Sequence, residues 1–277
     1  MGVQRFVLPF LLALSASTAP ALAASRGPCA EIDQRIGALK PDDAFQANAA
    51  LIAAARTGCP DSLDAALAHG ASVDGRDRFG ATALLRAAEA GKDAMVIALA
   101  AKGADIDARA VDGATALFLA VRASRAGAAH VLLEKGAKPG LTGPSGLTPL
   151  AAAAFAGADA LVADLLAHGA KPDAVDQTGK AAVLYAASRA SWRIVARLLD
   201  AGVDVNAAYE HKLTALMWAA GYADGAGLED VKATLDLLLK RGASLDPKDD
   251  RGLDAVAIAR GLGHDEIADW LAARALK

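Results

Sequence analysis

The sequence predicts an all-α solenoid of about seven helix-turn-helix units with short hairpin-like turns, and three observations lead to this prediction. A glycine returns every 33 residues, which indicates a stack of equivalent units rather than one irregular core. A second marker, usually threonine, runs in phase with the glycine. Apolar residues make up 54% of the chain but aromatic residues only 4%, so alanine supplies much of the apolar content and favours closely packed helices. The phased glycines are Gly70, Gly103, Gly136, Gly169 and Gly202, and the second marker falls at Thr82, Thr115, Thr148, Ala181, Thr214 and Asp254.

Each unit is predicted to hold the same elements in the same order, as the segment 77–107 illustrates. It opens with a turn that contains Asp and Gly, after which the hydroxyl of Thr82 can cap a first short helix. Gly91 ends that helix, where a residue of positive φ is useful. A second helix points Val96 and Leu99 inward, and Gly103 ends it. A short extended stretch then leads to the next turn.

This pattern resembles the ankyrin repeat over roughly residues 44–277. The family's Thr-Pro-Leu core is most complete at Thr148, Pro149 and Leu150, while the histidine that follows it in the family is absent from every copy. The resemblance implies a binding scaffold whose inner helices and hairpin tips form a concave surface for a partner protein. Shortened cores begin at Thr82, Thr115 and Thr214, and the closing Leu-Leu-x-x-Gly segment begins at Leu132, Leu165, Leu198 and Leu238.

The first 43 residues precede the repeats and divide into two segments. Residues 1–23 have the features of a secretory signal: Arg5, a short apolar run from Phe6 to Leu14, and a small-x-small site that ends at Ala23. The apolar run is too short to span a membrane. We therefore expect a chain cleaved near Ala23 that is periplasmic or secreted, with no membrane insertion after cleavage. Residues 24–43 form a leader with a short helix, and 44–277 form the repeat domain.

The chain has two cysteines, Cys29 and Cys59. In an oxidising compartment such an isolated pair is a disulfide candidate, and the bridge would tie the leader to the first repeat. The alternative is two free thiols, one of them buried. Neither cysteine belongs to a Cys-x-x-Cys motif, which argues against a redox or zinc role.

The sixth unit carries a seven-residue insertion. Thr214 and Gly242 are 28 residues apart, whereas Thr82 and Gly103 are 21 apart. The glycine-rich stretch 221–227 accounts for the excess, and it predicts a longer loop between the two helices of that unit. Insertions in solenoids often lie on the binding face.

The motifs indicate no catalytic, metal or cofactor site. None of the five histidines has the spacing of a metal ligand pair, and no nucleophile elbow or phosphate loop is present. Recurrent aspartates follow the repeat phase and are explained by turn formation. The net charge of −3 without a basic block argues against a nucleic-acid partner. The sequence therefore favours a protein that is not an enzyme.

Large side chains at variable positions are the candidates for partner binding. Several occupy the position four residues after the threonine marker, which the family resemblance implies is exposed. Tyrosine and tryptophan are favoured at the energetic centres of interfaces. The alternative is that these side chains fill gaps between units, and Trp192 and Trp270 are interpreted only in that way. The candidates are Arg86, Leu119, Phe155, Tyr185, Tyr209, Trp218 and Tyr222.

The favoured hypothesis is an exported, monomeric, non-enzymatic scaffold that binds an unknown partner protein in a bacterial cell envelope. Two alternatives remain open. The protein could be an immunity or inhibitor protein that blocks a toxin or hydrolase, with which its acidic charge is compatible. It could also be a secreted effector that acts on a host.

Overall fold

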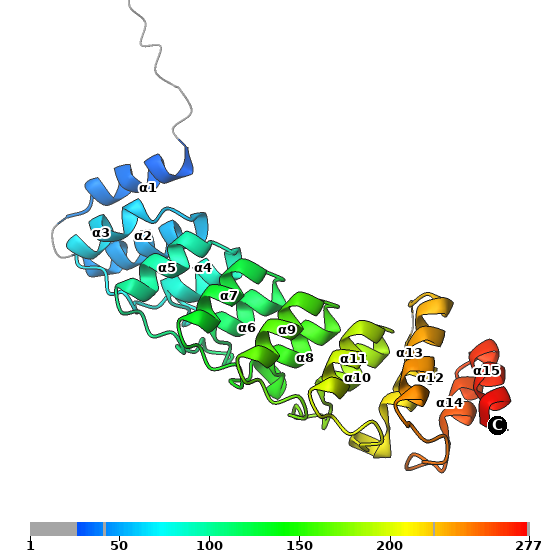
Figure 1. Cartoon of the computed structure of the whole chain (residues 1–277). Coiled ribbons are helices and arrows are strands. Elements are labelled where there is room, and N and C mark those ends of the chain that lie inside the picture. Colours follow the sequence, from blue (N-terminus) through cyan, green and yellow to red (C-terminus); the bar gives the residue numbers. More distant parts are fainter. Residues whose placement is uncertain (1–26, 41–42, 224, 276–277) are drawn as a thin grey trace, which may run out of the picture.

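The computed structural model describes residues 27–40, 43–223 and 225–275, and it forms an elongated array of paired helices (Figure 1). Within these residues seven helix pairs follow one short first helix, and no β-strand longer than an isolated bridge occurs. The predicted all-α solenoid of seven units is thus confirmed; the expected signal, 1–23, lies outside the described residues. The helices are α1 (Pro28–Gly37), α2 (Ala44–Thr57), α3 (Asp61–Ala68), α4 (Ala83–Ala90), α5 (Asp93–Ala101), α6 (Ala116–Arg122), α7 (Ala126–Glu134), η1 (Pro144–Gly146), α8 (Pro149–Phe155), α9 (Asp159–Ala167), α10 (Ala182–Ser188), α11 (Trp192–Asp200), η2 (Glu210–Lys212), α12 (Ala215–Gly221), α13 (Leu228–Lys240), α14 (Ala255–Gly261) and α15 (Asp265–Ala275).

The even-numbered helices from α4 to α14 form an inner row and begin at the second sequence marker. In the fourth unit the Thr148 hydroxyl accepts a hydrogen bond from the backbone N–H of Ala151 at 3.0 Å. Asp254 does the same for Ala257 at 2.8 Å. Such caps satisfy backbone donors that a helix start leaves unpaired. Ala181 holds the same extended conformation before α10 but has no side-chain oxygen to act as a cap.

Short hairpins precede the inner helices and are joined along the array. The Arg109 guanidinium donates to the carbonyl of Thr142, one period further along, at 3.1 Å. The hairpin tips are also joined by backbone bonds, as from Val111 N to the Phe79 carbonyl at 3.4 Å and from Glu210 N to Gly179 O at 3.4 Å. Pro144 occupies the position equivalent to Glu210 but has no N–H to donate. The row of tip-to-tip bonds is therefore interrupted before η1.

The core runs the length of the array as layers of alanine and leucine. Inner-helix alanines such as Ala87 and Ala153 are fully buried and let successive helices approach closely. Leucines such as Leu99, Leu132 and Leu165 fill the space between the inner and outer helices. Each unit therefore buries its apolar faces against its neighbours, as in other repeat solenoids.

The leader forms a helix that covers the first repeat. Helix α1 begins at Pro28, within the segment where a short helix was expected, and buries Ile32 and Ile36 against the core. The expected disulfide is present, because Cys29 and Cys59 are bonded with their Cα atoms 5.5 Å apart. The alternative of two free thiols is excluded. A covalent bond thus holds α1 over the open end of the solenoid.

The insertion in the sixth unit is divided between a loop and a helix. The connection from α12 to α13 has six residues, against three between α10 and α11, and α13 has 13 residues against nine in α11. The prediction of a longer loop is therefore correct only in part, because Leu228 and the acidic residues after it extend the outer helix by about one turn. No helix in the described part of the chain is long and apolar enough to cross a membrane.

Candidate functional site

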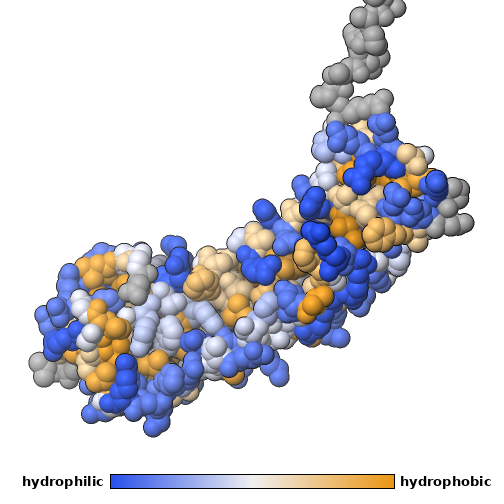
Figure 2. All heavy atoms as spheres, turned by 180° about the vertical axis from the view of Figure 1, so that it is seen from behind, coloured by the Kyte–Doolittle hydropathy of each residue, from blue (hydrophilic) through white to orange (hydrophobic). Residues whose placement is uncertain are grey.

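The inner-helix face, formed by the hairpin tips and the exposed side chains of the inner helices, holds most of the candidate residues. Figure 2 shows the molecule from behind the view of Figure 1. On this side hydrophobic patches alternate with hydrophilic side chains along the array, without one continuous apolar band. The position four residues after the cap is less exposed than expected. Leu119 is 5% exposed, and Ala152 and Ile258 are also buried.

In two units the side chain at this position is drawn inward, because it bonds to the hairpin residue nine positions earlier. Arg86 donates to the carboxylate of Asp77 at 2.6 Å, and the Tyr185 hydroxyl donates to Asp176. Burial by itself raises the pKa of each aspartate, but the hydrogen bonds from these partners and from backbone N–H groups outweigh it and lower the pKa. Arg86 and Tyr185 therefore help to hold their hairpins, so that binding is not their only explanation.

Four of the predicted aromatic residues form two ring pairs, Phe155–Tyr185 on α8 and α10 and Trp218–Tyr222 on α12 and its C-terminal cap, and we call these four residues the aromatic cluster. The Phe155 and Tyr185 rings meet edge to face with centroids 6.0 Å apart, and Trp218 and Tyr222 lie 4.8 Å apart. Phe155 is 54% exposed, whereas the other three are partly buried. The cluster thus combines an accessible ring with rings already fixed by packing.

Cations accompany the aromatic cluster on both sides. The Arg189 guanidinium lies 5.7 Å from the Phe155 ring centroid, and Lys180 Nζ lies 5.6 Å from that of Trp218. The Trp218 Nε1 is buried and has no hydrogen-bond partner among the described residues. A buried donor without an acceptor costs free energy, and because the atom is buried this cost belongs to the packing of the chain itself.

The remaining tyrosine and tryptophans lie elsewhere. Tyr209 is partly buried against the core, and among the described residues its ring contacts no ring of the cluster; burial raises its pKa. Trp270 packs against the core, as interpreted from the sequence. Trp192 was expected to pack too, but it is 39% exposed at the start of outer helix α11. Trp192 is the first residue of α11, and its ring lies against the Arg193 guanidinium, 4.8 Å from the ring centroid.

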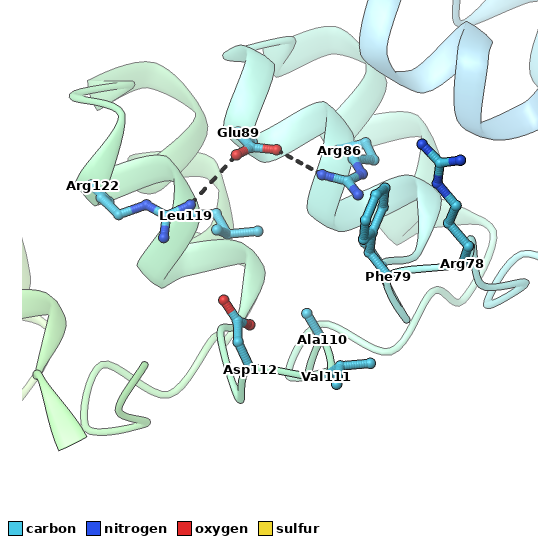
Figure 3. Close-up of a pocket in the computed structure, with 10 residues that line it drawn as sticks. Arg78, Phe79, Arg86, Glu89, Ala110, Val111, Asp112, Leu119 and Arg122 are labelled. Carbon is cyan, nitrogen blue, oxygen red and sulfur yellow. Dashed lines mark hydrogen bonds and ion pairs between the residues drawn. The ribbon is translucent and has the colours of Figure 1, made fainter. Parts of the chain in front are cut away.

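A second feature, which the sequence interpretation did not identify as a site, is a groove of about 500 Å³ over units two and three (Figure 3). The Phe79 and Val111 side chains come from consecutive hairpin tips, and Leu119 lies at its base. Glu89 bonds Arg86 at 3.1 Å and Arg122 at 3.5 Å across one side. The signal was in the sequence, because apart from Pro144 the other tips carry polar residues at the positions of Phe79 and Val111.

Neither feature has the composition of a catalytic centre. In the part of the chain that the structure describes, no group of three or more histidine, cysteine, aspartate or glutamate side chains could hold a metal ion. The ionisable residues around the groove are arginine, glutamate and aspartate, and most are engaged in ion pairs. Both features present apolar side chains beside cations, an arrangement suited to contact with another macromolecule.

Comparison with known proteins assigns the family. The sequence matches the profile of ankyrin repeats in three copies, over residues 21–110, 51–143 and 150–228. The chain belongs to the ankyrin repeat family. Its structure is similar to the crystal structure of the human ASB11 ankyrin repeat domain, with a TM-score of 0.65 and 28% identity over 76% of this chain and 90% of that one. A search of curated proteins gave no significant match. Ankyrin repeats indicate a protein-interaction scaffold, which agrees with the predicted class of function.

Proposed function

We propose that this ankyrin array is a non-enzymatic, monomeric scaffold that binds a partner protein in the cell envelope through its inner-helix face. The observation that carries the proposal is the aromatic cluster, which places an exposed ring and two cations on one surface. Exposed aromatic side chains supported by neighbouring packed ones supply much of the energy at protein interfaces.

An envelope location is supported by two features. The first is the secretory pattern of residues 1–23. The second is the Cys29–Cys59 disulfide, since such bonds persist in oxidising compartments and are rare in reducing ones. Fractionation of the source cells, with mass spectrometry of the N-terminus, tests the location. A chain that retains residues 1–23 and stays in the cytoplasm would refute it.

The binding proposal is tested by affinity capture from the envelope fraction with three tagged proteins. They are the mature chain (24–277), the double variant Phe155→Ala/Trp218→Ala, and the matched control Trp192→Ala. Because Trp192 is exposed on an outer helix, its loss removes a tryptophan without altering the inner-helix face. The partner is expected to be captured by the mature chain and the control but lost by the double variant.

Circular dichroism must show that the double variant remains folded, because Trp218 also packs against the core. Equal capture by the folded double variant and the mature chain would mean that the aromatic cluster does not bind the partner. Turnover of a hydrolase substrate by the purified chain would contradict the non-enzymatic part of the proposal.

A further inference from the structure

The groove over units two and three exists because two positions differ from their equivalents in other repeats. Where unit two has the Asp77–Arg86 pair and unit five has Asp176–Tyr185, unit three has Ala110 and Leu119. Neither of these side chains reaches outward to fill the surface. The resulting hollow lies between the two tips and is open to solvent (Figure 3).

The walls of the groove are apolar and fixed in position. Phe79 is 56% exposed and Val111 is 83% exposed, an unusual amount of solvent contact for side chains of this kind. The backbone bond from Val111 N to the Phe79 carbonyl, at 3.4 Å, sets the spacing between the two tips. A side chain that enters the groove therefore meets a preformed apolar slot, which lowers the entropy cost of binding.

The carboxylates around the groove have bonding partners within the chain, whereas two of the arginines have no carboxylate partner. Asp77 and Glu89 are held in ion pairs with Arg86, and the carboxylate of Asp112 accepts a bond from Ala114 N within its own hairpin. No carboxylate lies within ion-pair distance of Arg78 or Arg56 among the described residues.

Both of these free guanidinium groups lie on the Phe79 side of the groove. Arg78 lies over the Phe79 ring, 4.8 Å from its centroid. A second hollow of about 300 Å³ shares Phe79 and Arg86 with the groove and extends to Arg56. The unpaired guanidinium groups thus lie at the Phe79 end, whereas Arg86 and Arg122 are paired with carboxylates and the Val111 tip carries the carboxylate of Asp112.

We infer that the groove binds an extended segment of a partner protein that carries an apolar anchor residue with one or more carboxylates beside it. The anchor fills the slot between Phe79 and Val111 above Leu119, and the carboxylates pair with Arg78 and Arg56. The unequal charge sets the direction of the segment, because its acidic residues must lie toward Phe79 and away from Asp112. This inference rests on the proposed function, for which it specifies the chemistry of the partner.

A nucleic acid fits the same surface less well. The guanidinium groups around the two hollows are interspersed with the carboxylates of Asp77, Glu89 and Asp112, and the chain has a net charge of −3. They do not form the basic stripe that a phosphate backbone requires. A peptide segment needs only local charge complementarity together with an apolar contact.

The test is selection from a displayed library of random dodecapeptides on the immobilised mature chain, which requires no natural partner. Enriched peptides are expected to combine a leucine, isoleucine or phenylalanine with neighbouring aspartate or glutamate. The affinity of one enriched peptide, labelled with fluorescein, is then measured by anisotropy for three proteins. They are the mature chain, the variant Arg56→Glu/Arg78→Glu, and the groove variant Val111→Asp.

Each variant is expected to weaken binding by about tenfold or more, since each places like charges against the carboxylates of the peptide. The matched control is Arg193→Glu, which reverses the charge of an exposed arginine on outer helix α11 and should leave the affinity unchanged. Enrichment of peptides without acidic residues, no enrichment at all, or equal binding by the Arg56→Glu/Arg78→Glu variant would each overturn the inference.

The two proposals can fail separately. If mutation of the aromatic cluster abolishes partner capture but no peptide is selected by the groove, the scaffold proposal is supported and the inference about the groove is rejected. Selection of acidic peptides that depend on Arg78, with no dependence of partner capture on the aromatic cluster, supports the inference and moves the partner site to units two and three.

Discussion

The Tyr185 hydroxyl donates a hydrogen bond to Asp176, nine residues earlier, and thereby fastens the fifth hairpin to its own inner helix. Asp176 also accepts bonds from the backbone N–H groups of Thr178 and Lys180, so that the carboxylate organises the whole turn. A candidate binding residue is at the same time a structural one, and its two roles can be separated by experiment.

Replacing Tyr185 with Phe should lower the free energy of unfolding by about 1–2 kcal/mol, because a charged acceptor loses a partner while the ring is kept. Urea unfolding at neutral pH measures the loss. Tyr222→Phe is the matched control, since its hydroxyl lies 3.5 Å from Arg251 Nη2 and contributes little. Equal losses in the two variants would contradict this account of the Tyr185 hydroxyl.

The same bond predicts a dependence on pH at both extremes. Burial and the neighbouring Asp176 carboxylate raise the pKa of Tyr185 to about 12. Since the unfolded tyrosine ionises near 10, the contribution is complete below pH 10 and is lost as the pH rises toward 12. The pKa of Asp176 is lowered from 3.8, so its contribution is present above that pH and is lost as the pH falls below it. The stability difference between the mature chain and Tyr185→Phe should narrow at both ends, as urea unfolding across the pH range can show.

Ala181 is a helix start where a cap can be restored. Its backbone angles, φ −96° and ψ 167°, nearly equal those of the capping residue Thr115, φ −93° and ψ 167°, and both residues are buried. Ala181→Thr should therefore raise the free energy of unfolding by about 1 kcal/mol, and Thr148→Ala should lower it by a similar amount. A destabilised Ala181→Thr chain would mean that the threonine cannot adopt the capping geometry at this buried site.

Two glycines at equivalent positions should respond in opposite directions to alanine. Gly221 ends α12, and a Cβ there would lie 2.4 Å from Ile258 Cγ2, so Gly221→Ala is expected to destabilise by about 1–3 kcal/mol. Gly261 ends α14 with nothing within 4 Å of its Cβ position, so Gly261→Ala should stabilise by about 0.5–1 kcal/mol. Thermal unfolding measures the change in melting temperature of both variants. A change in the same direction for both would contradict the close approach of α12 and α14.

Loss of the disulfide should affect one end of the array alone. Cys29→Ala/Cys59→Ala removes a link that spans 30 residues, which is worth about 3–4 kcal/mol in the loop-entropy estimate. Because each repeat contacts only its neighbours, hydrogen exchange should accelerate in α1, α2 and α3 while α8 to α11 keep their protection. Uniform acceleration along the chain would instead indicate that the array unfolds as one cooperative unit.

The repeat architecture was predictable because backbone requirements leave a regular trace in the sequence. Glycines such as Gly91 and Gly103 recur where φ is positive, and capping residues such as Thr82 recur where a helix begins. The disulfide followed from there being two cysteines, Cys29 and Cys59, in a chain whose sequence predicts export. Each of these features depends on one residue or a fixed spacing, which sequence alone displays.

The binding surface was harder to predict because exposure depends on pairs of residues in different elements. Leu119 was expected to be accessible, but it is 5% exposed and lines the groove together with Ala110, nine positions earlier. The insertion was similarly divided between a loop and α13, because residues 228–231 continue a helical pattern that glycine content alone does not reveal. Such outcomes require the packing of the folded chain.

Pro144 removes one of the backbone hydrogen bonds that link adjacent hairpins. The tip-to-tip backbone bonds described above link adjacent hairpins, whereas at η1 that bond is missing. The contacts that remain there run from the Arg109 guanidinium to the Thr142 carbonyl and from the Lys138 N–H to the Asp107 carboxylate. Pro144→Glu, which supplies the residue found at the equivalent position in η2, should narrow the distance distribution between spin labels placed in units two and six. An unchanged distribution would mean that packing of α6 against α8 already fixes this junction. The groove and the aromatic cluster lie on opposite sides of this junction, so a narrower distribution would mean that the junction also sets how the two surfaces are presented to one partner.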